Sequence, residues 1–201
     1  MVGERGLIST QGRNLSLAIV AGLVFGLIAS EVSIDGIPLI NFLVQYNLWV
    51  YSGAYWQLFT SLFVVIPLGA AALLGVADVM FNAVAVVFLD GLLSHAFREQ
   101  EYYAVFVVSG LAGNIAGLLN GPNVVSFGAS GGIFGLLAGA VSHDFAVERR
   151  VDYNLLGWFL AIFLFSSFAL PSVDWLAHLG GAASGLALGY LLGTRRGNLS
   201  L

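Results

Sequence analysis

The sequence predicts an all-α membrane protein, a bundle of six transmembrane helices in a single domain over residues 1–201. Its composition, the lengths of its apolar runs and the positions of its basic residues all support this fold class. Of the 201 residues, 59% are hydrophobic and 9% are charged, whereas soluble domains carry about 25% charged residues. A surface this poor in charge is suited to lipid rather than to water.

Apolar runs of the right length occur at six places along the chain, since a spanning helix needs about 20 mostly apolar residues. The predicted spans cover residues 15–31, 72–94, 101–120, 129–147, 153–171 and 175–193. Residues 1–14 then form a short cytoplasmic N-terminus and residues 194–201 a cytoplasmic tail. A cleaved signal peptide is an alternative for the first run, because arginines precede it and Ala29 and Ser30 end it.

The basic residues all fall on one side of the six-span topology. They are the arginines Arg5, Arg13, Arg98, Arg149, Arg150, Arg195 and Arg196. The positive-inside rule makes that side the cytoplasm, so both termini are expected there. We expect a multi-pass protein of a prokaryotic plasma membrane.

The segment between the first two spans, residues 32–71, is long and has neither arginine nor lysine, but is rich in aromatic residues. Tryptophan and tyrosine favour the headgroup level of a bilayer. We therefore predict a membrane-lying first loop on the outer leaflet, with short helices near 38–48 and 56–64. The alternative is an extra pair of short spans or a re-entrant hairpin, which polar residues such as Gln57 and Thr60 disfavour.

Several function classes find no support in the sequence. The net charge of −4 disfavours a nucleic-acid partner, which needs a basic surface. There is no cysteine, so a thiolate nucleophile or a cysteine-bound metal is excluded. The histidines His95, His143 and His178 are expected to lie too far apart in depth to share one metal, and no H-E-x-x-H motif occurs. Neither a metal nor another cofactor is expected.

Glycines recur every fourth residue in the fourth and sixth spans. They are Gly131, Gly135 and Gly139 in the fourth, and Gly181, Gly185, Gly189 and Gly193 in the sixth. Residues four apart share one helix face, and small residues let two helix backbones approach closely in a membrane. The two spans are therefore expected to pack against each other.

One polar residue accompanies each glycine series, Ser130 in the fourth span and His178 in the sixth. Both lie near the outer ends of their spans, so close packing of the two helices would bring them together. A serine hydroxyl beside a neutral imidazole can act as a nucleophile with its general base. Because Ser130 begins its helix, free N–H groups there would favour a developing oxyanion.

Four stretches together carry a resemblance that covers nearly the whole chain. They are Gly128–Gly131, His178–Gly185, Asp78–Asn82 and Trp56–Thr60. The first matches the pattern G-x-S-G, and the second matches H-x-x-G-x-x-x-G. The third is similar to a second-helix segment that ends in an oxyanion-binding asparagine, and the fourth resembles an aromatic-rich first-loop signature. With its motifs in this order, the sequence resembles the rhomboid family of intramembrane serine proteases.

The resemblance implies a rhomboid-like bundle with a water-filled cavity open to the outside. It implies cleavage of peptide bonds in or beside the transmembrane segments of other proteins, by a Ser–His dyad without a third acid. Ser130 would be the nucleophile and His178 the general base. The Asn82 side chain and the Ser130 N–H would form the oxyanion hole, with Gly128 and Gly131 flanking the nucleophile. Partners would be transmembrane substrates and the bilayer; no oligomeric state is predicted.

Three residues depart from the family's pattern. Asp78 stands where a histidine usually donates to the oxyanion, Phe134 where a tyrosine usually stacks on the catalytic histidine, and Gln57 where the loop signature has arginine. An ionised aspartate would repel the oxyanion. This leaves open a catalytically inactive rhomboid-like protein that binds transmembrane clients. A small transporter is a third interpretation, but it predicts internal repeats that are not evident.

Overall fold

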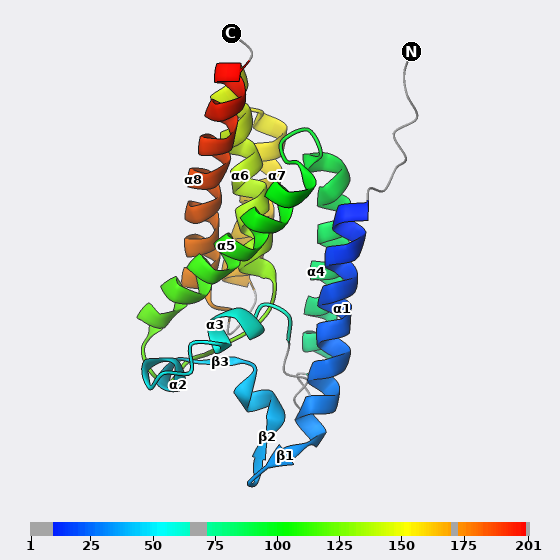
Figure 1. Cartoon of the computed structure of the whole chain (residues 1–201), viewed down its shortest axis with the longest axis vertical. Coiled ribbons are helices and arrows are strands. Elements are labelled where there is room, and N and C mark those ends of the chain that lie inside the picture. Colours follow the sequence, from blue (N-terminus) through cyan, green and yellow to red (C-terminus); the bar gives the residue numbers. More distant parts are fainter. Residues whose placement is uncertain (1–9, 65–71, 170–172, 200–201) are drawn as a thin grey trace.

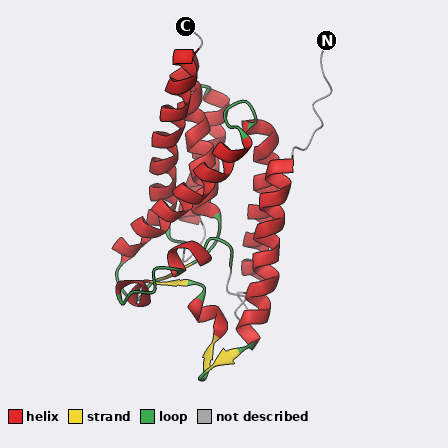
Figure 2. Cartoon of the chain, in the orientation of Figure 1, coloured by secondary structure: helices red, strands yellow, loops and turns green. Residues whose placement is uncertain are grey.

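A helix forms at each of the six predicted spans in the computed structural model, which describes residues 10–64, 72–169 and 173–199 (Figures 1 and 2). These helices are α1 (Thr10–Glu31), α4 (Ala72–Leu93), α5 (Glu99–Gly117), α6 (Ser130–Glu148), α7 (Tyr153–Leu164) and α8 (Trp175–Leu199). A 3-10 turn, η3 (Leu118–Asn120), extends α5, and a π-helical turn, η4 (Phe165–Ala169), extends α7. The start of α1 and the end of α8 lie at the same end of the bundle (Figure 1).

Helices long and apolar enough to cross a membrane occur at α5, α6 and α8 in the described chain. Their spans are Glu99–Asn120, Ser130–Glu148 and Trp175–Gly197. Shorter apolar stretches lie in the other long helices, at Arg13–Gly26, Met80–Leu93 and Tyr153–Phe168. The protein is therefore an integral membrane protein built from apolar helices, and its six-fold crossing of the membrane stays a prediction.

Local sequence explains where the helices of the second half begin and end. Arg149 adopts a left-handed conformation, with φ of 57°, and its N–H donates to the Phe145 carbonyl, which closes α6. The Asp152 carboxylate then accepts from the N–H groups of Asn154 and Leu155 at 2.8 and 3.1 Å. It is thus the N-cap of α7, and the arginine-containing turn predicted between the fourth and fifth spans forms at this place.

The centre of the bundle is α6. Every residue from Gly131 to Val141 is buried, so this helix presents no polar face to solvent along three turns. The helices α4, α5, α7 and α8 pack around it, while α1 packs against α4. The most deeply buried side chains of the core include Val86, Phe106, Leu136 and Leu137. Ser130, the predicted nucleophile at the start of this helix, is therefore held by the most enclosed of the described long helices.

The glycines of α6 and α8 face each other, as their spacing predicts. A Cβ atom added to any of three glycines of α8 would overlap a backbone carbonyl oxygen of α6. The pairs are Gly181 with Gly131, Gly185 with Gly135, and Gly189 with Gly139. The two backbones thus touch over more than two turns, a distance that only glycine permits.

The first loop is more irregular than predicted. Instead of one helix near 38–48, it contains the hairpin β1–β2 (Ser33–Ile34, Ile37–Pro38), the 3-10 turn η1 (Leu39–Phe42), the strand β3 (Gln45–Tyr46) and the helix α2 (Asn47–Tyr51). The helix predicted near 56–64 is the short α3 (Gln57–Thr60). Residues 65–71 of this loop lie outside the described residues.

Backbone pairing explains why the continuous helix does not form. Strand β3 pairs antiparallel with β4 (Val125–Ser126), which directly precedes α6. Pairing with a distant strand requires an extended backbone, so it interrupts any helix across residues 45–46. Aromatic side chains of the loop remain exposed, among them Tyr55 at 68% and Trp56 at 53%. Such exposure is compatible with the predicted membrane-lying loop, whose contact with a bilayer stays a prediction.

The last helix is longer than predicted. It continues through Leu199, whereas a tail was expected from residue 194. The Arg196 guanidinium donates to the Ala96 carbonyl at 2.8 Å and pairs with the Glu101 carboxylate. These contacts with the α4–α5 turn and the start of α5 stabilise the last turns of α8, which explains why the helix continues beyond residue 193.

Candidate active site

Ser130 and His178 lie in hydrogen-bond contact. The Ser130 hydroxyl is 2.8 Å from Nε2 of His178, although 48 residues separate them in sequence. Ser130 opens α6 and His178 lies in the first turn of α8. The glycine contacts between these two helices place both backbones close enough for the side chains to meet. His178 is only 5% exposed, so few competing water contacts reach the ring.

An aromatic ring covers the imidazole. The centroid of Phe134, one helical turn after Ser130, lies 4.6 Å from that of His178 with the planes inclined at 54°. Phe163 of α7 is at 6.4 Å. The residue at the position where the family usually has tyrosine therefore keeps its contact with the histidine, through a tilted rather than a parallel arrangement.

The start of α6 provides N–H groups close to the Ser130 side chain. N–H groups in the first turn of an α-helix have no carbonyl partner within the helix, and the N-cap residue Ala129 adds no side-chain cap. The amide of Gly128 is different: it donates to the Ser61 carbonyl at 2.8 Å. Its expected role near the nucleophile is therefore conformational, because its φ of 107° is one that other residues rarely adopt.

The segment before Ser130 is held from two sides. On one side, β4 pairs with β3 of the first loop. On the other, the Ser126 hydroxyl donates to the Asp174 carboxylate at 2.6 Å. Asp174 also accepts from the Ala177 N–H at 3.0 Å and so caps the start of α8. One carboxylate thus connects the strand that precedes Ser130 with the helix that carries His178.

Buried amide side chains hold the first loop together and attach it to α5. Asn114 of α5 donates to the Leu58 carbonyl at 2.7 Å and to the Ser61 hydroxyl at 2.9 Å. Gln57 accepts from the Tyr46 N–H and donates to the Asn41 carbonyl, both at 3.0 Å. An arginine at position 57 has no acceptor atom for that N–H. The glutamine found here instead of the family's arginine therefore makes a hydrogen bond, with the Tyr46 N–H, that an arginine side chain could not accept.

The second nitrogen of the imidazole also has a partner, which the sequence did not reveal. The Ser167 hydroxyl lies 2.8 Å from Nδ1 of His178. Ser167 is 6% exposed and comes from η4, beyond the end of α7. The only hint in the sequence is the pair Ser166–Ser167 within an otherwise apolar run. Asp174 was likewise missed as a structural residue, although an aspartate just before a helix is a common N-cap.

The structure gives fewer contacts for Asn82 and Asp78, the two residues of α4 that were predicted near the oxyanion. Asn82 is 2% exposed on α4 and has interactions there, and its role at the oxyanion stays a prediction. Asp78 lies within α4, but its side chain is outside the described part of the structure. A surface pocket between α1 and α4 and another in the first loop include neither Ser130 nor His178. The water-filled cavity stays a prediction.

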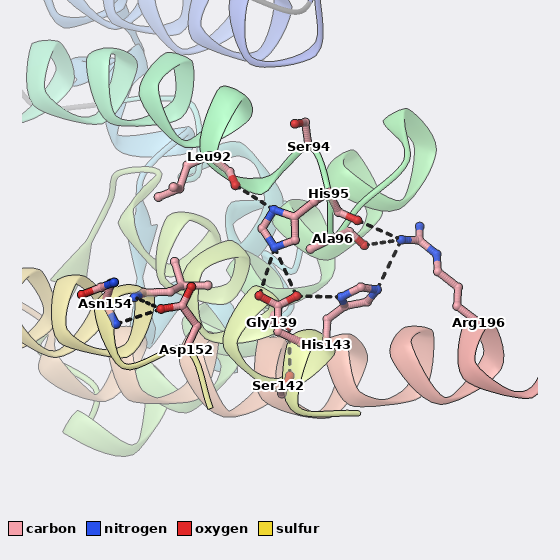
Figure 3. Close-up of polar contacts among 12 residues, drawn as sticks. Leu92, Ser94, His95, Ala96, Gly139, Ser142, His143, Asp152, Asn154 and Arg196 are labelled. Atoms are coloured by element: carbon pink, nitrogen blue, oxygen red, sulfur yellow. Dashed lines mark hydrogen bonds and ion pairs between the residues drawn. The ribbon is translucent and has the colours of Figure 1, made fainter. Parts of the chain in front are cut away.

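A second polar cluster lies at the opposite end of α6 (Figure 3). Asp144 accepts from His95 at 3.0 Å and from Nδ1 of His143 at 3.1 Å. The turn after α4 folds back onto α6 and brings His95 and His143 together at this end, whereas His178 contacts Ser130 at the other end. Among the described residues, no group of three or more histidine, cysteine or acidic residues is arranged to hold a metal ion.

His95 faces acceptors at both of its nitrogens. Nδ1 is 2.9 Å from the Leu92 carbonyl, and Nε2 is 3.0 Å from the Asp144 carboxylate. Both nitrogens must therefore carry a proton for both bonds to form. The hydrogen bond to Asp144 raises the pKa of His95 above its ordinary value, and partial burial offsets this in part.

We expect the free energy of unfolding to decrease as the pH rises through the raised pKa of His95. Because the folded-state pKa lies above the unfolded one, the stabilisation is complete below about pH 6.5. It should amount to less than about 1 kcal/mol, since the ring is half exposed. Thermal unfolding in detergent between pH 6 and 9 measures it. The slope should shrink in Asp144→Asn, and an unchanged slope in that variant would contradict the assignment.

Comparisons with known proteins agree with the motifs. A family model described as "Rhomboid domain" matches residues 52–195. "RHOMBOID-like protein 1" of Arabidopsis thaliana is 30% identical over 147 residues, which are 71% of this chain and 36% of that protein. "RHOMBOID-like protein 4" of the same plant is 30% identical over 123 residues, 59% of this chain and 31% of that protein. The chain thus spans about a third of the length of these two relatives.

A bacterial relative is covered more fully. "Putative rhomboid protease YdcA" of Bacillus subtilis (strain 168) is 29% identical over 153 residues, which are 73% of this chain and 71% of that protein. The family model covers well over half of the chain, including the turn before α6 and nearly all of α8. The chain therefore belongs to the rhomboid family, whose members are generally intramembrane serine proteases.

Proposed function

We propose that this protein is a serine endopeptidase that cleaves the transmembrane segments of other membrane proteins. The contact between the Ser130 hydroxyl and Nε2 of His178, at 2.8 Å, is the observation that supports this most. In a bundle built from apolar helices, a buried ionisable residue is costly and is a functional hypothesis by default. Here that residue is His178, and it contacts the proposed nucleophile Ser130 at the start of α6.

The proposed reaction follows the ordinary course of acyl transfer. The Ser130 oxygen forms a bond with the substrate's carbonyl carbon while its proton passes to Nε2 of His178. The electron pair of the carbonyl moves onto its oxygen. When the C–N bond breaks, the leaving amine takes the proton from Nε2. Water then attacks the acyl group with the same histidine as base, which releases the acid and restores Ser130.

The oxyanion of this reaction would lie at the N-terminus of α6. Support comes from the helix start itself, where first-turn N–H groups lack helical partners and the helix dipole favours negative charge. We assign the Ser130 N–H and the Asn82 side chain to this role. Gly128 would contribute by its backbone conformation, since its own amide donates to Ser61.

The substrates would be membrane proteins whose transmembrane segments enter from the bilayer, as expected for the rhomboid family. For the orientation we propose cytoplasmic termini in a prokaryotic plasma membrane. The positions of the seven basic residues support this, as does the contact of Arg196 with the turn between α4 and α5. The predicted cytoplasmic ends therefore lie together.

A fluorophosphonate probe tests the proposed function directly. In detergent, the wild-type protein should be labelled at a single serine, because only an activated hydroxyl displaces fluoride from phosphorus at a useful rate. Labelling should disappear in Ser130→Ala and in His178→Ala. Ser142→Ala is a matched control on the same helix, since that hydroxyl donates to the Leu186 carbonyl at 2.8 Å instead of serving the site. Its labelling should equal that of the wild type.

The opposite outcome would favour the alternative. If the folded wild-type protein takes no label from fluorophosphonate or isocoumarin probes, the protease proposal fails. The inactive rhomboid-like protein that binds transmembrane clients would then be the better interpretation, with Asp78 as the residue that departs from an active oxyanion site.

A further inference from the structure

We propose that Ser167 is a positioning residue that holds His178 in the one tautomer and ring orientation able to act as the base for Ser130. This rests on the proposed function of Ser130 and His178. It adds a third side chain to the site from a third helix, because Ser130 belongs to α6, His178 to α8 and Ser167 to the turn after α7.

The need for such a residue follows from the chemistry of imidazole. A neutral imidazole carries one N–H, and its other nitrogen is an acceptor. Nε2 can take the Ser130 proton only when the ring proton is on Nδ1. In the opposite tautomer Nε2 would donate to Ser130 and could not serve as its base. The Ser167 oxygen lies 2.8 Å from Nδ1. A hydroxyl can donate to a bare nitrogen or accept from an N–H, and we assign Ser167 the acceptor role, in which it stabilises the competent form.

Packing alone does not select the ring orientation. Turning the ring by 180° exchanges each nitrogen with a carbon of almost the same size. The neighbouring rings of Phe134 and Phe163, at 4.6 and 6.4 Å, touch both orientations nearly equally. The hydroxyls distinguish them, because Ser130 and Ser167 each contact a nitrogen in the observed orientation. With the ring rotated by 180°, each hydroxyl would face a C–H group instead.

The irregular end of α7 brings Ser167 to the histidine. Residues Phe165–Ala169 form a π-helical turn, and such a turn changes which side chains face a neighbouring helix. Ser166, the preceding residue, has its hydroxyl 3.5 Å from the Phe163 carbonyl of its own helix. The Ser167 side chain is directed at the imidazole instead, with its oxygen 2.8 Å from Nδ1 and 6% of the residue exposed. The two adjacent serines therefore provide a matched pair for experiment.

During the reaction Ser167 would remain an acceptor. When Ser130 attacks, its proton moves to Nε2 and the ring becomes an imidazolium, with Nδ1–H still donating to the Ser167 oxygen. The proton on Nε2 then leaves with the amine, and the ring returns to the same tautomer. Ser167 neither gains nor loses a proton over the cycle. It differs from a carboxylate in this place because it offers a dipole rather than a full charge.

The first measurement is spectroscopic and does not depend on activity. In protein labelled with ¹⁵N-histidine, the His178 signals are identified by their absence in His178→Ala, and the N–H couplings show which nitrogen is protonated. At neutral pH we expect the Nδ1–H tautomer in the wild type and in Ser166→Ala. In Ser167→Ala we expect a mixture of both tautomers. The same single tautomer in Ser167→Ala would overturn the proposal.

The second measurement is the rate of labelling by a fluorophosphonate, in which the Ser130 oxygen bonds to phosphorus, fluoride leaves and the proton passes to Nε2. Its dependence on probe concentration separates the maximal rate from the concentration for half-saturation. Ser167→Ala should lower the maximal rate about tenfold, the value of one ordinary hydrogen bond, and leave half-saturation unchanged. Ser167→Thr, which keeps the hydroxyl, should restore most of the rate, and Ser166→Ala should match the wild type.

The outcomes distinguish this proposal from the proposed function. Labelling of Ser167→Ala at the wild-type rate would overturn the role of Ser167 and leave Ser130 as the nucleophile. A wild-type protein that is never labelled would contradict the proposed function, while the tautomer measurement would still decide the role of Ser167. Thermal unfolding of each variant shows whether it folds, and Ser167→Ala removes a single oxygen from a helical position.

Discussion

A Gly185→Ala variant is expected to lose a large part of its stability and its reactive site together. A methyl group at position 185 would overlap the Gly135 carbonyl oxygen, which belongs to the backbone of a central helix and has no room to move. The two helices must separate, at a cost of about 3 kcal/mol or more. Separation would also stretch the contact between Ser130 and His178, now 2.8 Å.

Thermal unfolding in detergent and fluorophosphonate labelling, measured on the same samples, check this result. Gly157→Ala is the matched control, because nothing lies within 4 Å of a Cβ atom at that position of α7. There alanine should be neutral or stabilising by up to about 1 kcal/mol, since glycine is a poor helix former. A Gly185→Ala variant as stable and as reactive as the control would show that close glycine packing is not what brings Ser130 and His178 together.

Ser130→Ala and His178→Ala are each expected to reduce substrate cleavage by about 10³-fold or more, and the double variant is expected to be no worse than either. The physical reason is that the two groups act as one unit: a hydroxyl without its base and a base without its hydroxyl are equally ineffective. A quenched-fluorescent single-span peptide in liposomes, with small residues near its outer end, is a suitable substrate.

Additive losses would contradict this prediction. If the cleavage rate of the double variant falls by the product of the two single fold-losses, Ser130 and His178 contribute independently. Their contact of 2.8 Å would then be structural. Ser142→Ala serves again as the control on α6 and should cleave at the wild-type rate, because its hydroxyl donates to carbonyls of α6 and α8.

Much of the candidate site could be predicted because its information is local and periodic. Glycines at intervals of four reveal which faces of the fourth and sixth spans can touch, and Ser130 and His178 occur at matched depths near the outer ends of those spans. Both patterns can be recognised in a single sequence because residue spacing determines the direction in which a side chain leaves an α-helix. The contact of Phe134 with His178 follows from the same geometry, one turn along α6.

Other contacts could not be predicted because they join segments with no periodic relation. The pairing of β3 with β4 involves two residues on each side, which is too short to leave a pattern in the sequence. His95 and His143 meet at Asp144 only because a turn folds back. The length of α8 depends on Arg196, whose partners Ala96 and Glu101 lie about a hundred residues earlier.

The sequence by itself determined the membrane class, the positions of the long helices and the pair Ser130–His178. These depend on composition and helical spacing, which act along one chain segment at a time. Only the tertiary structure decided how the pair is supported. Ser167 reaches Nδ1 of His178 through a π-helical turn, and Asp174 connects β4 with the start of α8. Hydrogen bonds between side chains on different helices also depend on how each helix is rotated against its neighbours, and packing between the helices sets that rotation.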